Sequence, residues 1–567
     1  MSDMASRSCP QCQTAFTVTE DDLAFLDKMS PIFGGKKQAL PPPTLCPPCR
    51  MRRRLMFRNE RFLYRRESDL SKRQIVSRFS SEKALLQYHS DEWFGDAWQA
   101  TDYGQDVDFS RPFFEQMQEL SLAVPRMALI TSPDAEANNC SYINFAGHSR
   151  NCYMTFDSDY NEDSYYTKVL KHSKNCVDCA FVQDSELCYE CVDCAQSYRL
   201  LFSEDSVNCS NSAFLKNCTG CRNCLFCVNL VQKEYHIENK PYPKEEYERI
   251  LASLNLGGAD TDALRAKLKT FSLLHPRKAT QTLKAENCSG DYILNAKDCR
   301  ECFDVGDAED LRYCDSLYKA RGCGDVSSFG EQIEGVYESG TAGIGCYNML
   351  FTFACVISCS DLIYCLEART SRNCFGCVGV KKNEYCILNK QYTKEEYEVL
   401  VPKIIEHMKK TGEWGEFFPV SMACFAYNET VAQEWFPLTK EEVLERGWTW
   451  REQTDEIPKV DRTIPGAQLP ASIDDVPDDV LQWAITCEAT GRPFRILKQE
   501  LEFYRTMRVP VPRVHPDVRH DRRMDSRRPR TLWDRTCAKC KNPIRTTYAL
   551  DRPETVYCES CYLSIVY

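Results

Sequence analysis

Two sets of four cysteines have the spacing of metal-binding knuckles. The first set is CPQC at 9–12 with CPPC at 46–49, and the second is CAKC at 537–540 with CESC at 558–561. Two CxxC pairs supply four thiolates, which is enough to close a tetrahedral zinc site. We therefore predict two zinc ions. Their ligands would be Cys9, Cys12, Cys46 and Cys49 in the first site and Cys537, Cys540, Cys558 and Cys561 in the second.

Each pair of knuckles with the residues between them is typical of a zinc ribbon. Two further stretches of the chain align with these two ribbons but have lost most of the cysteines. Residues 66–93 match the C-terminal ribbon, and residues 487–519 match the N-terminal one. Neutral hydroxyls are poor zinc ligands beside thiolates, so we expect both to keep the ribbon shape without metal. The ligand positions are Ser68, Ser71, His89 and Glu92 in one, and Cys487, Thr490, His515 and Val518 in the other. The side chains expected to hold them by packing are Ile75, Tyr88, Phe494, Leu501 and Phe503.

An arginine-rich segment follows the first ribbon, at 50–66, and recurs near the C-terminus, at 519–535. Guanidinium groups suit phosphate, and a row of them on a helix can follow a phosphate backbone without reading bases. The net charge of −11 leaves an alternative open, in which these arginines pair with acidic protein surface. The predicted RNA-docking residues are Arg50, Arg53, Arg54, Arg58, Arg61, Arg65, Arg522, Arg523 and Arg527.

The middle of the chain is a cysteine-rich stretch that occurs twice. Cys152, Cys176 and Cys188 are separated by multiples of twelve residues, and the segment 138–250 recurs at 288–400. A fixed short period indicates stacked short strands, as in a β-solenoid. We expect these three cysteines to lie side by side on one inward face.

The many CxxC pairs of this core allow three interpretations. The thiols can form a buried ladder of small apolar side chains, add further zinc sites, or ligate an iron–sulfur cluster. We favour the buried ladder. The possible additional metal ligands are Cys218, Cys221, Cys224, Cys227, Cys374 and Cys377.

The chain as a whole predicts a multidomain, mainly β protein with some α-helix: treble-clef or zinc-ribbon tandems at both ends flank a duplicated β-solenoid-like core. No apolar run approaches 18 residues, so no membrane span is expected. The absence of a secretory signal predicts reduced cysteines and a cytoplasmic location. The expected parts are a zinc ribbon with its Arg-rich helix (1–66), a metal-free ribbon (67–93), a connector (94–137), two Cys-rich modules (138–250 and 288–400) joined by a helical linker (251–287), a helical and acidic segment (401–480), a second metal-free ribbon (481–519), and an Arg-rich connector with the last zinc ribbon (520–567).

Several stretches together resemble one known family. They include PPPTLCPPCRMRRRLMFRNER, DYGQDVDFSRPFFEQ, SELCYECVDC, RPFRILKQELEFYR and DRPETVYCESCY. They are similar to uncharacterised Cys-rich, multi-zinc-ribbon proteins of candidate phyla radiation bacteria. The resemblance implies zinc and a cytoplasmic setting, and it implies no activity. Family members usually hold cysteines in all four ribbons, and this chain departs from that pattern in the two described above.

The motifs of common enzyme classes, GxGxxG, the P-loop, HExxH and GxSxG, are absent from the sequence. We therefore expect a non-enzymatic zinc-binding adaptor that docks RNA or a ribonucleoprotein through its Arg-rich segments. One alternative is a scaffold for protein–protein interaction and assembly. A second alternative is a redox or metal-handling protein that uses the core CxxC thiols.

Overall fold

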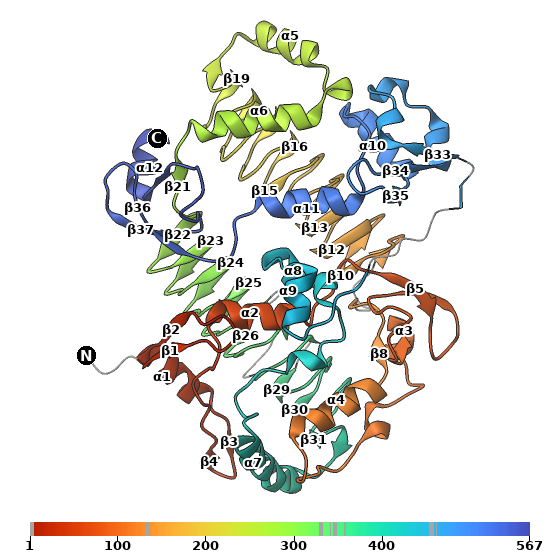
Figure 1. Cartoon of the computed structure of the whole chain (residues 1–567), viewed down its shortest axis with the longest axis vertical. Coiled ribbons are helices and arrows are strands. Elements are labelled where there is room, and N and C mark those ends of the chain that lie inside the picture. Colours follow the sequence, from red (N-terminus) through yellow and green to blue (C-terminus); the bar gives the residue numbers. More distant parts are fainter. Residues whose placement is uncertain are drawn as a thin grey trace.

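The structure of the chain is a computed structural model, and it has many strands and fewer helices (Figure 1). It agrees with the expected combination of many strands and some α-helix. None of the helices it describes has both the length and the apolar character needed to cross a membrane. The residues described are 5–131, 137–327, 333–340, 342–343, 349–356, 359–452, 459–460 and 462–566.

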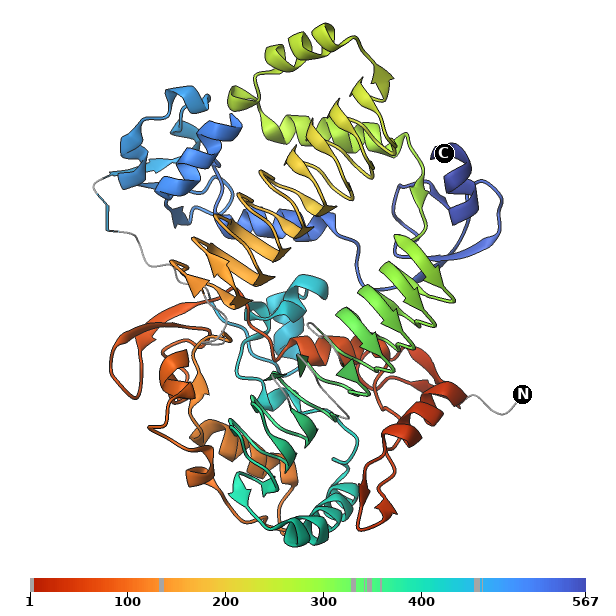
Figure 2. The same cartoon turned by 180° about the vertical axis from the view of Figure 1, so that it is seen from behind.

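A first ladder of parallel strands occupies the upper half of the molecule (Figures 1 and 2). Neighbouring strands pair with a register of twelve residues, as Thr155 with Thr167 and Ala180 with Val192. The sequence period is therefore the strand register. The strands are β10 (Asn144–Gly147), β12 (Tyr153–Asp159), β13 (Tyr165–Lys171), β14 (Ala180–Gln183), β15 (Val192–Ala195), β16 (Tyr198–Leu201), β17 (Ser210–Ala213), β18 (Arg222–Leu225) and β19 (Glu234–Ile237).

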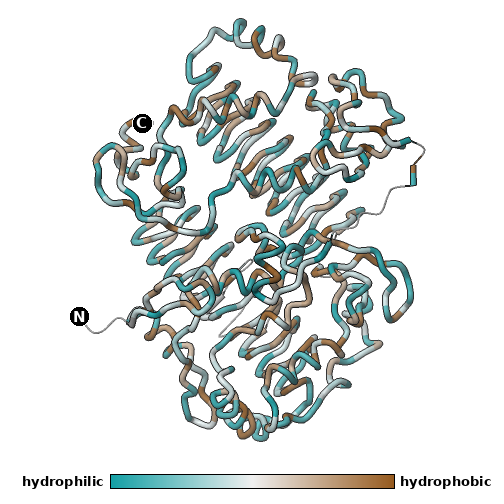
Figure 3. Tube along the Cα trace, in the orientation of Figure 1, coloured by the Kyte–Doolittle hydropathy of each residue, from teal (hydrophilic) through white to brown (hydrophobic). Residues whose placement is uncertain are grey.

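Within this ladder every third residue between Tyr142 and Glu238 has a positive φ. Each such residue makes a left-handed corner, so the chain turns after every three residues. In a plain strand, side chains alternate between faces. Here the corners instead turn residues three apart, such as Cys176, Cys179 and Val182, to the same interior, where each is at most 1% exposed. Polar and apolar residues accordingly alternate over short distances along the ladders (Figure 3).

A second parallel ladder runs through the lower half. The sequence offset between paired strands varies in this ladder. Gly290 pairs with Cys302, twelve residues later, whereas Ala320 pairs with Ile333, thirteen residues later. Its core contains the same kind of inward cysteines. The strands are β22 (Thr282–Glu286), β23 (Gly290–Lys297), β24 (Cys302–Glu309), β25 (Asp315–Arg321), β26 (Ile333–Glu334), β27 (Ala342–Gly343), β28 (Cys355–Val356), β29 (Ser360–Ile363), β30 (Arg372–Phe375) and β31 (Cys386–Ile387).

Four short antiparallel hairpins lie at the positions of the four predicted ribbons. They are β1 (Ala5–Ser8) with β2 (Ala15–Val18), β5 (Tyr64–Glu67) with β6 (Gln74–Ser77), β34 (Trp483–Thr486) with β35 (Pro493–Phe494), and β36 (Trp533–Thr536) with β37 (Pro543–Thr546). The second and fourth hairpins pair equivalent residues, Tyr64 with Ser77 and Trp533 with Thr546. All five side chains expected to support the metal-free ribbons are buried.

The helices complete the core and connect its parts. Helix α2 lies beside the second ladder, and α11 crosses the first (Figure 1). The N-terminal ribbon therefore packs on the second module and α11 on the first, whereas the last ribbon also contacts the second module, where Thr547 donates to Asp291. The helices of eight or more residues are α1 (Glu20–Met29), α2 (Pro47–Leu55), α4 (Phe113–Ala123), α5 (Lys244–Leu254), α6 (Thr261–Leu273), α7 (Lys394–Thr411), α10 (Lys498–Met507), α11 (Pro516–Ser526) and α12 (Glu559–Val566); α3 (Ser90–Phe94), α8 (Val431–Trp435) and α9 (Lys440–Glu445) are shorter.

Candidate metal sites and arginine clusters

The N-terminal four-cysteine group is assembled as predicted. One ligand atom from each of the four cysteines lies within 4.8 Å of the others, and the Sγ atoms of Cys12 and Cys46 are 3.5 Å apart. The first knuckle is a turn in which Gln13 has φ 62° and its N–H donates to the carbonyl of Cys9. The second opens α2. With zinc–sulfur bonds of about 2.3 Å, a tetrahedral site spaces its sulfurs by about 3.8 Å, so the group fits a metal ion.

The C-terminal group has the same construction. Its four sulfurs also lie within 4.8 Å of one another, and the Sγ atoms of Cys540 and Cys558 are 3.7 Å apart. Lys541 has φ 64° and donates to the carbonyl of Cys537, which repeats the first knuckle turn. Although burial opposes ionisation, nearby backbone N–H groups lower the pKa of Cys537 to about 6, which favours the thiolate that a metal requires.

In the ribbon at 67–93 a carboxylate occupies the place between the knuckles. The hydroxyls of Ser68 and Ser71 both donate to Glu92, and the N–H of His89 donates to the same carboxylate at 3.1 Å. Burial raises the pKa of Glu92, but these hydrogen bonds outweigh it and lower the pKa below its usual value. Glu92 therefore links both halves of a ribbon whose thiolates are absent.

The ribbon around Cys487 also keeps its knuckle turn. Gly491 has φ 71° and donates to the carbonyl of Cys487, and the N–H of His515 donates to the Cys487 sulfur at 3.2 Å. The imidazole of His515 accepts from the N–H of Asp517. Among the described residues, neither of these two ribbons forms a group of metal ligands like the two above.

The six core cysteines considered as additional ligands are all 0% exposed and point into the ladders. Their thiols donate to main-chain carbonyls, as Cys218 does to Cys227 at 3.5 Å and Cys221 to Leu230 at 3.4 Å. Burial raises the pKa of Cys218 and Cys377, whereas hydrogen bonds with neighbouring thiols, Cys209 and Cys224, lower the pKa of Cys221 and Cys227. Because the chain turns at every third residue, cysteines three apart point into the same interior, which accounts for their CxxC spacing without a metal. The geometry favours the buried ladder over added zinc or an iron–sulfur cluster.

Arg50 and Arg54 of α2 point into the second ladder rather than into solvent. Arg50 Nε lies 2.8 Å from Asp325 Oδ2, and Arg54 Nη1 lies 3.6 Å from the same oxygen. All three side chains are almost completely buried. Although burial opposes its charge, Asp325 raises the pKa of Arg50 above its ordinary value, so the guanidinium stays charged inside the protein.

The arginines of α11 make the equivalent contacts with the first ladder. Arg519 forms an ion pair with Asp178, and Arg523 Nη1 lies 2.8 Å from the other oxygen of that carboxylate. Asp178 and Asp325 both occupy left-handed corners, at φ 53° and 55°. Asp and Asn are the side chains that tolerate this conformation best. The corners thus place outward-pointing carboxylates where the arginine helices pack.

Other arginines of the two segments are also paired within the chain. Arg527 lies between the ladders, 2.6 Å from Asp304. Burial raises the pKa of Asp304, but Arg527 and Arg530 outweigh it and lower the pKa to about 2. The remaining pairs are Arg53 with Glu338 at 2.8 Å, Arg58 with Asp157 at 2.9 Å, and Arg61 with Asp517 at 2.8 Å.

The RNA-docking prediction therefore needs correction for most of its residues. Seven of the nine predicted arginines carry buried or nearly buried side chains already held by carboxylates, so they present no surface to phosphate. Their contacts agree instead with the alternative interpretation, in which the arginines pair with acidic side chains of the protein. Arg65 and Arg522 are exposed, and Arg65 donates to the Tyr142 hydroxyl while Arg522 pairs with Asp262 at 3.2 Å.

A buried charge cluster at the centre was missed from the sequence. Lys168 Nζ lies 2.9 Å from Glu60 and also pairs with Glu434, whose other oxygen is 3.1 Å from His520 Nε2. Burial and then the charge of Arg61 lower the pKa of His520 to about 3, so its imidazole is neutral. The cluster joins four distant chain segments, which a sequence pattern does not reveal.

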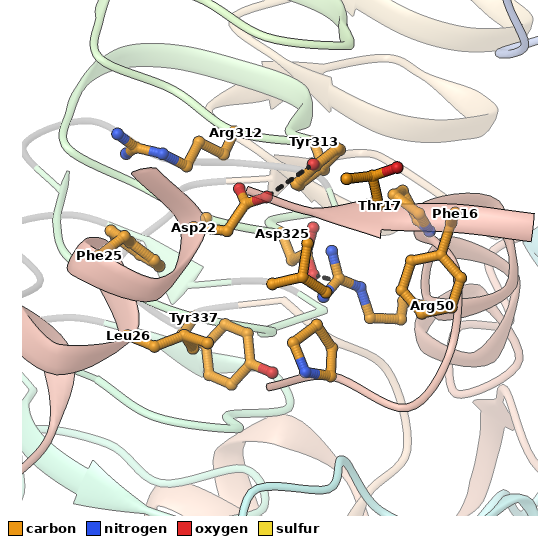
Figure 4. A pocket seen from close by; sticks show the side chains of 14 residues that line it. Phe16, Thr17, Asp22, Phe25, Leu26, Arg50, Arg312, Tyr313, Asp325 and Tyr337 are labelled. Carbon is orange, nitrogen blue, oxygen red and sulfur yellow. Dashed lines mark hydrogen bonds and ion pairs between the residues drawn. The ribbon is translucent and has the colours of Figure 1, made fainter. Parts of the chain in front are cut away.

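A small cavity lies between the first ribbon and the second ladder (Figure 4). The hydroxyl of Tyr313 donates to Asp22 at 3.2 Å on one side, and the Arg50–Asp325 pair lies on another. Its volume of about 30 Å³ suits water rather than a metabolite, because ligand pockets usually exceed about 300 Å³.

The chain has no match among known family models, curated proteins or solved structures.

Proposed function

We propose that this protein is a non-enzymatic, zinc-stabilised scaffold that binds a protein partner. The proposal is supported by the positions of the cysteine thiols and the arginine side chains. The core thiols are buried and hydrogen-bonded, and the arginine segments are largely occupied by carboxylates of the same chain. These groups stabilise the fold, which leaves the uncovered sides of the ladders for recognition.

We further propose that zinc is the ion of both four-cysteine groups. Four thiolates in tetrahedral arrangement are the usual set for structural zinc. In this architecture the ladders are β-solenoids made of narrow coils. The first ladder has a corner at every third residue, and the described part of the second has this spacing over much of its length. The hairpins are treble-clef or zinc-ribbon units, two with metal and two closed by side chains.

The partner-binding surface that we propose is a row of corners of the first ladder other than the row, including Asp178, that the arginines of α11 contact. Three aromatic rings stack there on successive coils. The ring centroids of His148 and Tyr160 are 4.5 Å apart and those of Tyr160 and His172 are 4.9 Å apart, with nearly parallel planes. Tyr160 is 52% exposed. We call these residues, together with the neighbouring charges, the aromatic-charge patch.

The charged part of the patch is a row beside the rings. Arg150 pairs with Glu162, and Lys174 Nζ lies 3.4 Å from the same carboxylate. Exposed tyrosine and arginine are enriched at protein interfaces, where they anchor the contact. The rings are held by stacking and the charges by pairing, so little side-chain entropy remains to be lost on binding. This pre-ordered patch is the observation that carries the scaffold proposal.

The test is cross-linking of the full-length protein in native lysate, followed by mass spectrometry of the captured species. We expect a protein partner that is retained after ribonuclease treatment and lost with Tyr160→Asp. Val399→Asp is the matched control, because Val399 is 60% exposed on α7, away from the patch.

Two outcomes would contradict the proposal. Loss of all bound material after ribonuclease would favour the RNA adaptor. Equal capture by the Tyr160→Asp and Val399→Asp proteins would exclude the patch as the binding surface.

A further inference from the structure

The two four-cysteine groups differ in how well their sulfur atoms are protected from solvent. In the N-terminal group Cys9, Cys46 and Cys49 are each at most 4% exposed. Phe16 and Leu45 pack against them. Solvent reaches this group chiefly through its remaining ligand, Cys12.

A nearby cation also covers the N-terminal group. Arg52 Nη2 lies 3.6 Å from the sulfur of Cys49. A tetrathiolate zinc centre carries a net negative charge, so a guanidinium at this distance lowers the reactivity of the thiolate. The second knuckle is further fixed because the next residue, Arg50, is locked to Asp325.

The C-terminal group is open by comparison. Only Cys537 is buried, Cys540 is exposed, and Cys558 and Cys561 are partly exposed. The last helix, α12, lies at the surface, and its Ile565 is 51% exposed. An incoming thiol, chelator or metal ion can therefore approach three of the four sulfurs.

We infer that the C-terminal group is an exchangeable site for thiophilic divalent ions, whereas the N-terminal group holds its ion permanently. Both have the same donor atoms, so their intrinsic preference for zinc is similar. The difference lies in access, because ligand exchange requires the incoming group to reach the metal or a sulfur. No change in the oxidation state of sulfur or metal is needed.

The exchangeable site lies where its occupancy affects the junction between the ladders. Strand β38 (Val556–Tyr557), just before Cys558, pairs with β21 (Arg277–Lys278), which precedes the second ladder. Lys278 Nζ lies 2.6 Å from Glu559 beside the same knuckle, and Asn217 of the first ladder donates to Tyr562. Because structural zinc couples to folding, emptying the site would loosen this junction.

The test is pulsed alkylation of the zinc-loaded full-length protein after addition of EDTA. Peptide mass spectrometry would follow N-ethylmaleimide labelling at each cysteine. We expect Cys540, Cys558 and Cys561 to be labelled at least about ten-fold faster than Cys46 and Cys49. Cys12 is the matched control, since it is exposed like Cys540 but belongs to the protected group. Hydrogen exchange at 276–286 should rise with C-terminal labelling.

Equal labelling rates in the two groups, or faster labelling of the N-terminal one, would overturn the inference. Full labelling of the C-terminal cysteines before EDTA is added would also overturn it, because the group would then hold no ion. The inference rests on the proposed zinc occupancy of both groups but not on the protein partner. Labelling before EDTA is added would also count against zinc in the proposed function, whereas equal labelling rates would overturn the inference alone.

Discussion

Arg50 of α2 lies 2.8 Å from Asp325 on a corner of the second ladder, and both side chains are buried. The same relationship recurs between Arg519 of α11 and Asp178 of the first ladder. In each helix a second arginine, four residues later, approaches the same aspartate. Residues four apart share a helix face, so each helix holds one corner carboxylate with two guanidinium groups.

The first prediction concerns these buried pairs. Arg519→Ala leaves Asp178 less neutralised inside the protein, so we expect a loss of about 3–5 kcal/mol in the free energy of unfolding. Arg522→Ala on the same helix is the control, because its exposed pair with Asp262 should contribute at most about 1 kcal/mol. Urea titration measures both. Equal effects would show that the buried pair is not a major contact.

The second prediction concerns the carboxylate-closed ribbon. Glu92→Gln removes the charge that accepts from Ser68 and Ser71, and we expect a loss of about 1–3 kcal/mol. Hydrogen exchange should increase in β5 and β6. Glu82→Gln is the control, because Glu82 makes an exposed pair with Arg451. Unchanged exchange in the Glu92→Gln ribbon would contradict the proposed role of this carboxylate.

The third prediction tests whether residues at the left-handed corners of the ladders are selected for their tolerance of positive φ. Val169 has φ 50°, a left-handed conformation that is strained for a β-branched side chain. Val169→Asn should stabilise the protein by about 1 kcal/mol. Val177→Asn, at a buried position that is not a corner, should destabilise it. Thermal unfolding of the two variants would reveal opposite shifts, and a destabilised Val169→Asn protein would contradict this selection.

The fourth prediction separates core thiols from metal ligands. Cys221→Ala should leave the metal content of the protein unchanged, because its thiol donates to a main-chain carbonyl. Cys540→Ser should reduce the content by one ion per chain. Elemental analysis after dialysis measures both, and a lower metal content in the Cys221→Ala protein would assign metal to the core.

The fifth prediction concerns pH. His520 has a pKa of about 3 when folded, and an unfolded histidine titrates near 6.5. The unfolded state therefore binds a proton more readily, and the stability contributed by neutral His520 is complete above pH 6.5 and falls as the pH drops toward 3. The loss is about 1.4 kcal/mol per pH unit in that range. The stability advantage over His520→Asn should shrink from pH 7 to pH 5, and a constant difference would contradict the pKa shift.

Local patterns in the sequence predicted several features of the structure. The four candidate ligands of each group come together, and Thr393 with Glu396 and Thr439 with Glu442 form capping boxes at the starts of α7 and α9, as the Thr-x-x-Glu spacing indicates. These features depend on short-range spacing, which a sequence carries directly.

The environment of the arginines did not follow from the same patterns. Asp325 and Asp178 are far from Arg50 and Arg519 in sequence, and only the fold brings them together. One signal was present, because many Asp and Asn residues of the core are separated by multiples of three residues, as are Asp157, Asp163 and Asp178. That period indicates left-handed corners and accounts for the CxxC pairs as inward neighbours.

The most direct test of the scaffold account is native mass spectrometry of the full-length protein isolated from its own cells. The account predicts that the wild-type chain carries two zinc ions and a bound protein partner. The Tyr160→Asp chain should carry two zinc ions and no partner. A chain without zinc, or one whose bound partner is RNA, would contradict it.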